Sequence, residues 1–104
     1  MIVEQRDYHV FTGKLNEVVS MYESEGIELQ RKHLGTLVGV FTTDVGALST
    51  YTALWAYDSY AEREQRRASL QADPDWKDFL ARLQPLLHTQ QNRILIPTSF
   101  SPLR

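Results

Sequence analysis

Hydrophobic and polar residues alternate through the first eleven positions of the chain, where β-forming residues are interleaved with charged ones. This alternation predicts a strand over residues 2–11. Apolar residues then recur at spacings of three, four or seven, which predicts a helix over about residues 14–33 with one buried face. Gly26 lies on that face, where glycine weakens a helix, so we expect an irregularity there.

Two runs of β-branched and aromatic residues follow this helix. Gly35 is expected to end the helix, and the runs TLVGVFTT (residues 36–43) and YTALWAY (residues 51–57) predict the second and third strands. The short segment of residues 44–49 lies between the two runs. This spacing favours an antiparallel hairpin.

The third predicted strand carries no charged residue on either face. Its side chains fall into two alternating sets, Tyr51, Ala53, Trp55 and Tyr57 against Thr52, Leu54 and Ala56. A strand with water on one face usually alternates apolar with polar residues. We therefore expect both faces of this strand to be covered.

The rest of the chain predicts two helices and a fourth strand. Ser59 and Glu62 match a capping box, which predicts the start of a mostly solvated helix. Asp73 and Pro74 are suited to the first positions of a second, amphipathic helix. The run NRILIP (residues 92–97) predicts the fourth strand, with its final proline limiting it.

The predicted order of strand, helix, two strands, helix pair and strand defines the fold class. It is the split βαβ pattern of ferredoxin-like α+β domains with a four-stranded antiparallel sheet. Helices in this topology lie on one face of the sheet and leave apolar residues of strands two, three and four uncovered on the other. We expect a second copy of the chain to cover them, giving a homodimer whose sheets pack as a dimeric α+β barrel.

Composition limits the class of protein. A chain of 104 residues with 42% apolar residues predicts a single domain over residues 1–104. The net charge of −2 argues against a broad basic surface for nucleic acid or anionic lipid, and no segment approaches the about 20 apolar residues that span a bilayer. Cysteine is absent, and the first residues lack the apolar core of a signal peptide. We expect a cytoplasmic protein that binds neither nucleic acid nor membranes.

Five residues are candidates for a ligand site. Arg6 and Tyr8 share a face of the first strand, Trp55 and Tyr57 share a face of the third, and Asn92 lies on the fourth. The first and third strands are neighbours in this topology, so an aromatic floor with one guanidinium would hold an anionic or planar ligand. The alternative is that these are core and dimer-face residues with a satisfied arginine.

The sequence gives little indication of metal binding, nucleophilic catalysis or phosphate binding. His9, His33 and His88 are scattered at a strand end, a helix end and a loop, without metal-ligand spacing. Neither a nucleophile motif nor a phosphate-binding loop is present. The run REQRR (residues 63–67) is interpreted as decoration of a solvated helix. We expect no metal and no cofactor.

The chain resembles the NIPSNAP family over nearly its whole length. The segments that carry the resemblance are VEQRDY, LQRKHLG, VGVFTTDVG, LWAYDSYAEREQRRASL, DPDW and NRILIP. The resemblance implies the dimeric α+β barrel, a fold also used by antibiotic-biosynthesis monooxygenases, haem-degrading enzymes and muconolactone isomerases, and it implies no particular reaction. Family members commonly have a histidine before the LW pair; this chain has Ala53 there, so no imidazole role is implied at that position. Mammalian members are associated with mitochondria, but this N-terminus does not resemble an Arg-rich transit peptide.

Two functions are consistent with these patterns. The first is binding of a small organic molecule inside the dimeric barrel, with or without cofactor-independent oxygenase or isomerase chemistry. In an enzyme, Arg6 would neutralise developing negative charge, Tyr8 would donate a hydrogen bond and Asn92 would add a polar contact. The second is a non-enzymatic interaction or scaffold protein, which predicts a fully packed interior without a sizeable pocket.

Overall fold

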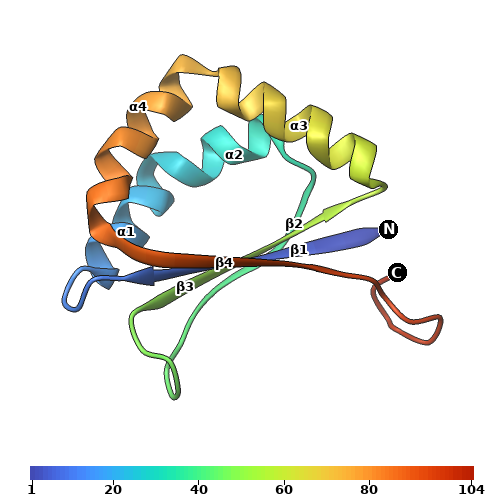
Figure 1. The fold of residues 1–104 in the computed structure, drawn as a ribbon, viewed down its shortest axis with the longest axis horizontal. Helices are drawn as coiled ribbons and strands as arrows, with labels where there is room; N and C mark the ends of the chain where they lie inside the picture. The colour runs from blue at the N-terminus through green and yellow to red at the C-terminus, as the bar shows by residue number, and fades with distance from the viewer.

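The computed structural model describes all 104 residues and consists of one sheet and one layer of helices (Figure 1). In chain order the elements are β1 (Ile2–Val10), α1 (Leu15–Met21), the π-helical turn η1 (Tyr22–Gly26), α2 (Ile27–His33), β2 (Thr36–Thr42), β3 (Thr50–Tyr57), α3 (Tyr60–Ala72), α4 (Pro74–Leu83), the 3₁₀ turn η2 (Gln84–Leu86) and β4 (Leu87–Leu95).

The four strands form an antiparallel sheet in the order β2-β3-β1-β4. All helices lie on one face of this sheet (Figure 1). The sequence-based prediction of a ferredoxin-like split βαβ fold with a four-stranded antiparallel sheet is therefore confirmed, and so is the β2–β3 hairpin.

The hydrophobic core lies between the helices and the inner face of the sheet. Even-numbered residues of β1 and odd-numbered residues of β3 point toward the helices, and Tyr8 pairs with Tyr51 across the two strands. Trp55 and Phe79 are the largest fully buried side chains in this core. Burial of such apolar area stabilises the fold by about 25 cal/mol per Å².

The long first helix is interrupted where the sequence predicts an irregularity. The Ile27 N–H donates to the carbonyl of Tyr22, five residues earlier, which defines a π-helical turn. A Cβ atom at Gly26 would lie 2.4 Å from Cζ of Phe79, so a side chain larger than hydrogen does not fit there. Gly26 therefore allows α4 to approach the first helix closely.

Side-chain caps fix the two C-terminal helices. The Ser59 hydroxyl accepts from the Glu62 N–H at 3.1 Å, as the capping box predicts, but the Glu62 carboxylate accepts from the N–H of Asp58 rather than of Ser59. Asp73 caps α4 by accepting from the N–H of Asp75 at 2.9 Å. Both helix starts agree with the sequence-based prediction.

The fourth strand begins earlier than predicted. It starts at Leu87 instead of Asn92, so His88 lies in a strand and not in a loop. Residues 88–91 are polar and exposed, and they lack the apolar alternation by which a strand is recognised. Main-chain pairing with β1 makes them a strand, because an edge strand needs no buried side chains.

The outer face of the sheet has no helix over it. It is more polar at its centre than the sequence predicts, since the Thr52 hydroxyl donates to Asp7 at 2.7 Å. The same face also carries apolar side chains, including Leu54, Leu95 and the exposed Phe41. No helix in the structure is long and apolar enough to cross a membrane.

Candidate ligand-binding site

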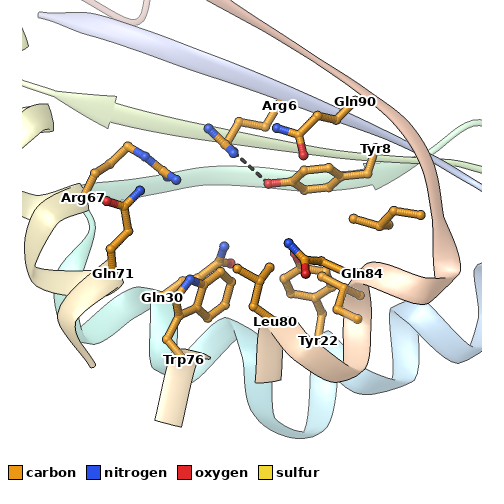
Figure 2. Close-up of a pocket in the computed structure, with 12 residues that line it drawn as sticks. Arg6, Tyr8, Tyr22, Gln30, Arg67, Gln71, Trp76, Leu80, Gln84 and Gln90 are labelled. Carbon is orange, nitrogen blue, oxygen red and sulfur yellow. Dashed lines mark hydrogen bonds between the residues drawn. The ribbon is translucent and has the colours of Figure 1, made fainter. Parts of the chain in front are cut away.

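A cavity of about 190 Å³ lies between the inner face of the sheet and the helices (Figure 2). Its lining comes from β1, β4, the first long helix, α3 and α4, so that segments from both ends of the chain contribute. An engineered cavity of about 150 Å³ holds a benzene molecule. This cavity therefore has room for one substituted six-membered ring.

Arg6 of β1 forms the roof of the cavity. The residue is 7% exposed, and Nε donates to the Tyr8 hydroxyl at 2.7 Å (Figure 2). Nη1 donates to Glu4 at 2.9 Å. No group of the chain accepts a hydrogen bond from Nη2. Arg6 is thus held firmly on one side and keeps donors for a further partner.

Glu4 is the anion that holds this arrangement together. Its side chain is fully buried, and Arg63 of α3 donates to its two oxygens at 3.2 and 2.7 Å. Burial alone would raise the pKa of this carboxyl, but the Arg63 hydrogen bond and the charges of Arg6 and Arg63 outweigh it, so the pKa is lowered. Glu4 is therefore ionised and neutralises part of the arginine charge.

Asn92 supports Arg6 from the neighbouring strand, where the two residues are directly paired. Both ends of its amide are satisfied when the oxygen accepts from Nη1 of Arg6 at 2.7 Å and the nitrogen donates to the Gln91 carbonyl at 2.9 Å. Together with Glu4, this contact uses both hydrogens of Nη1. Asn92 orients Arg6 and does not itself line the cavity.

Arg67 is the second cation of the cavity. Its side chain reaches from α3 toward Arg6 and forms neither a hydrogen bond nor an ion pair within the chain (Figure 2). Its partial burial and the nearby Arg6 charge lower the pKa of its guanidinium, although an arginine remains protonated at neutral pH. The cavity thus contains a cation without an anionic partner.

Four glutamine side chains supply amides to the same lining: Gln30, Gln71, Gln84 and Gln90. Gln30 is 3% exposed, and its Oε1 has no hydrogen-bond partner. A buried polar group without a partner costs about 1–3 kcal/mol. Gln30 is therefore the polar side chain for which a bound molecule, or a water, offers the largest gain.

The opposite end of the lining, where Gln30 and Gln84 also lie, contains the apolar side chains (Figure 2). Trp76 and Leu80 of α4 and Tyr22 of the π-helical turn form this end (Figure 2). Burial raises the pKa of Tyr22 well above its usual value, so its hydroxyl stays neutral. Flat aromatic and branched aliphatic walls suit a planar, apolar group.

The structure brings together only part of the predicted site. Arg6, Tyr8 and Asn92 are in contact, but Trp55 and Tyr57 are buried elsewhere in the core and do not line the cavity. Trp55 and Tyr57 do not form a floor for this cavity, because the β1–β3 register sets Trp55 opposite Glu4 and Tyr57 opposite Ile2. The cavity also lies within one chain, under its helices, and not between two sheets.

Sequence reasoning missed several lining residues. Arg63 and Arg67 were assigned to a solvated helix, whereas one pairs with buried Glu4 and the other lines the cavity. The signal available was their spacing of four, which puts both on one face of α3. Gln30 and Trp76 gave no signal, because a glutamine in a helix and an aromatic in an apolar stripe are ordinary residues there.

A second polar cluster joins α2 to the junction of α3 and α4. Nδ1 of His33 lies 2.7 Å from the Ser69 hydroxyl, and Nε2 lies 2.8 Å from the Asp73 carboxylate. The sequence places His33 only at the end of a helix. The His33 hydrogen bond and the Asp75 N–H lower the pKa of Asp73. Because Asp73 also caps α4, the cluster fixes where the helices meet.

The fold and the cavity define a small ferredoxin-like α+β domain with an arginine-lined pocket under its helices. The NIPSNAP family model matches residues 3–102, and the chain belongs to the NIPSNAP family. The family resemblance seen in the sequence is thereby confirmed.

Similar proteins and solved structures support this assignment. A crystal structure of a NIPSNAP family protein from Agrobacterium tumefaciens is 45% identical, with a TM-score of 0.97 over 99% of this chain and 98% of that one. The Drosophila melanogaster protein NipSnap is 30% identical over 101 residues, which are 97% of this chain and 36% of that protein. A Caenorhabditis elegans relative is 31% identical over 102 residues, 98% of this chain and 19% of its own length. This chain thus spans about a third or less of these curated relatives.

A solved structure with much lower sequence identity has a similar fold. The structure of an antibiotic biosynthesis monooxygenase matches with a TM-score of 0.65 over 94% of this chain and 99% of that one, at 6% sequence identity. Such a low identity shows a shared fold alone.

Proposed function

We propose that this NIPSNAP domain binds a small organic molecule in the cavity between its helices and its sheet. The observation that carries this proposal is the set of polar groups without partners in the lining, namely Nη2 of Arg6, the Arg67 guanidinium and Oε1 of Gln30. Of these groups, Oε1 of Gln30 is buried without a partner, and an unsatisfied buried group is rare in folded proteins and needs an explanation such as a bound molecule. These groups line a cavity, whereas a pure scaffold protein is expected to have a fully packed interior.

Binding is better supported than any particular reaction. The lining contains no histidine, aspartate or glutamate that would serve as a general base. Arg6 and Tyr8 nevertheless form a pair of donors suited to a negatively charged oxygen, as in an enolate or phenolate. Oxygenase or isomerase chemistry without a cofactor is therefore the enzymatic form of this proposal, and it requires a substrate that ionises without help from the lining.

Native mass spectrometry of protein purified without denaturation tests the proposal. We expect a discrete extra mass that disappears on denaturation, and liquid chromatography with mass spectrometry of the released material identifies it. A bare protein mass, combined with no binding in a screen of small organic molecules, would refute the proposal. The interaction or scaffold function would then take its place.

We also propose that a second copy of this chain covers the outer face of the sheet. Support comes from Leu54, Leu95 and Phe41 on that face, because no helix of the chain lies over them. Two sheets packed in this way would form the dimeric α+β barrel. In this arrangement each chain keeps its own cavity on the inner face of its sheet.

A further inference from the structure

The charges around the cavity are unbalanced. Three guanidinium groups, those of Arg6, Arg63 and Arg67, lie near one carboxylate, that of Glu4. Glu4 is already bonded to Arg6 and Arg63. No aspartate or glutamate lines the cavity, so Arg67 and the free side of Arg6 face it without a counter-charge. A buried cation is stabilised when an anion reaches it.

The two ends of the cavity differ in chemistry. Arg6 and Arg67 lie on one side of the cavity, and Trp76, Leu80 and Tyr22 lie on the other, with Gln30 beside Trp76 (Figure 2). An inorganic anion would satisfy only the first end. A neutral apolar molecule would satisfy only the second and leave the guanidiniums unpaired.

We infer that the ligand is a monoanionic carboxylic acid carrying one planar ring, an inference that rests on the proposed function. The carboxylate lies between Arg6 and Arg67, since guanidinium groups bind carboxylates through paired N–H donors. The ring lies against Trp76 and Leu80. The volume of about 190 Å³ limits the acid to a single substituted ring.

A comparison of charged and neutral ligands of equal shape tests this inference on the unmodified protein. Benzoate and salicylate are titrated against benzamide and salicylamide by isothermal titration calorimetry at pH 7 and low salt, after removal of any retained molecule. We expect each acid to bind at least about tenfold more tightly than its amide, because a hydrogen bond to a charged group is stronger than one to a neutral group. Equal affinities of acid and amide would overturn the inference.

Substitution of Arg67 tests whether its guanidinium binds the carboxylate of the ligand. We expect Arg67→Gln to weaken binding of the acids about tenfold or more and to leave the amides unchanged. Arg31→Gln is the matched control, because Arg31 is exposed on α2 and the substitution removes the same charge. An equal loss in both variants would indicate a general charge effect and would overturn the placement at Arg67.

The failure of this inference is distinguishable from the failure of the proposed function. If amides bind as well as acids, or a neutral molecule is retained in the native mass spectrum, a ligand site exists but the acid is the wrong class. If none of the four compounds binds and the retained molecule is not a single-ring carboxylic acid, a ligand site exists but the inferred class is again excluded. If nothing binds and nothing is retained, both proposals fall.

Discussion

Nε of Arg6 donates to the hydroxyl oxygen of Tyr8 at 2.7 Å, between two side chains on the same face of β1. Because this oxygen already accepts a hydrogen bond, the hydroxyl hydrogen of Tyr8 is left for another acceptor. Nη2 of Arg6 likewise keeps its hydrogens. The pair therefore presents donors of two kinds to the same cavity.

Removal of the Tyr8 hydroxyl separates binding from folding. We expect Tyr8→Phe to fold, to lose about 1 kcal/mol of unfolding free energy with one hydrogen bond, and to retain less of the bound molecule in native mass spectra. Tyr57→Phe is the control: the Tyr57 hydroxyl is buried without a partner, so its loss should leave stability equal or slightly higher and the retained mass unchanged. Equal retention in wild type and Tyr8→Phe would contradict a role of this hydroxyl in binding.

Neutralising Glu4 tests the charge network that positions Arg6. Glu4→Gln keeps the shape of the side chain but leaves Arg6 and Arg63 without their shared anion. Breaking a buried ion pair costs about 3–5 kcal/mol, and we expect a loss of that size in urea unfolding. Glu28→Gln, at an exposed position of α2, should change stability by less than about 0.5 kcal/mol. If Glu4→Gln changes the unfolding free energy as little as Glu28→Gln does, the charge network does not stabilise the fold.

The lowered pKa of Glu4 makes stability depend on pH. A carboxyl with a lower pKa in the folded state stabilises the fold above its ordinary pKa of 4.5, and this contribution is lost as the pH falls through the lower folded value. We expect the unfolding free energy of the wild type to decrease below about pH 4.5. In Glu4→Gln this decrease should be smaller, leaving the part due to other acids such as Asp73. Unfolding free energies are measured by urea titrations between pH 7 and pH 3. Identical pH profiles of the wild type and Glu4→Gln would contradict a contribution of Glu4 to this pH dependence.

Gly26 is required by the Phe79 ring. Alanine favours a helix over glycine by about 1 kcal/mol, but its Cβ would overlap the ring, and overpacking costs about 1–3 kcal/mol. We expect Gly26→Ala to destabilise the protein on balance. A double-mutant cycle with Phe79→Leu measures the coupling, because the smaller side chain makes room for the methyl group. Simple additivity of the two substitutions would exclude the steric explanation.

The proposed dimer is tested by sedimentation. We expect the wild type to sediment as a dimer at micromolar concentration, and Leu54→Glu, on the outer face of the sheet, to shift it toward the monomer. Ala68→Glu, at an exposed position on α3, adds the same charge elsewhere and should leave the dimer intact. A monodisperse wild-type monomer would rule out the proposed assembly.

The sequence predicts the fold well because its signals are local and repeat along the chain. The caps at Ser59 and Asp73 give the helix starts to the residue, and the run around Trp55 identifies a central strand. The start of β4 was missed because its polar residues are held by main-chain pairing, which no side-chain pattern records.

The cavity was harder to predict, because it depends on which side chains from distant segments converge. Arg6 and Tyr8 were found because they are two residues apart on one strand. Arg67 reaches them from α3, and Gln30 from α2, so neither is near them in sequence. Trp55 and Tyr57 lie in the core outside this cavity, and their sequence could not show this, because aromatic residues dominate ordinary cores as well as pockets.

The π-helical turn at Tyr22–Gly26 sets the rotational phase of the helix around it. An α-helix advances about 100° per residue, so eight residues of regular helix would leave Tyr22 and Gln30 about 80° apart. The one extra residue of a π turn subtracts about 100° and brings them to nearly the same direction, where both line the cavity. A single-residue deletion within this turn would restore a regular helix and rotate Tyr22 away from Gln30. Loss or gain of one residue in this turn would therefore change which side chains line the cavity without changing the fold.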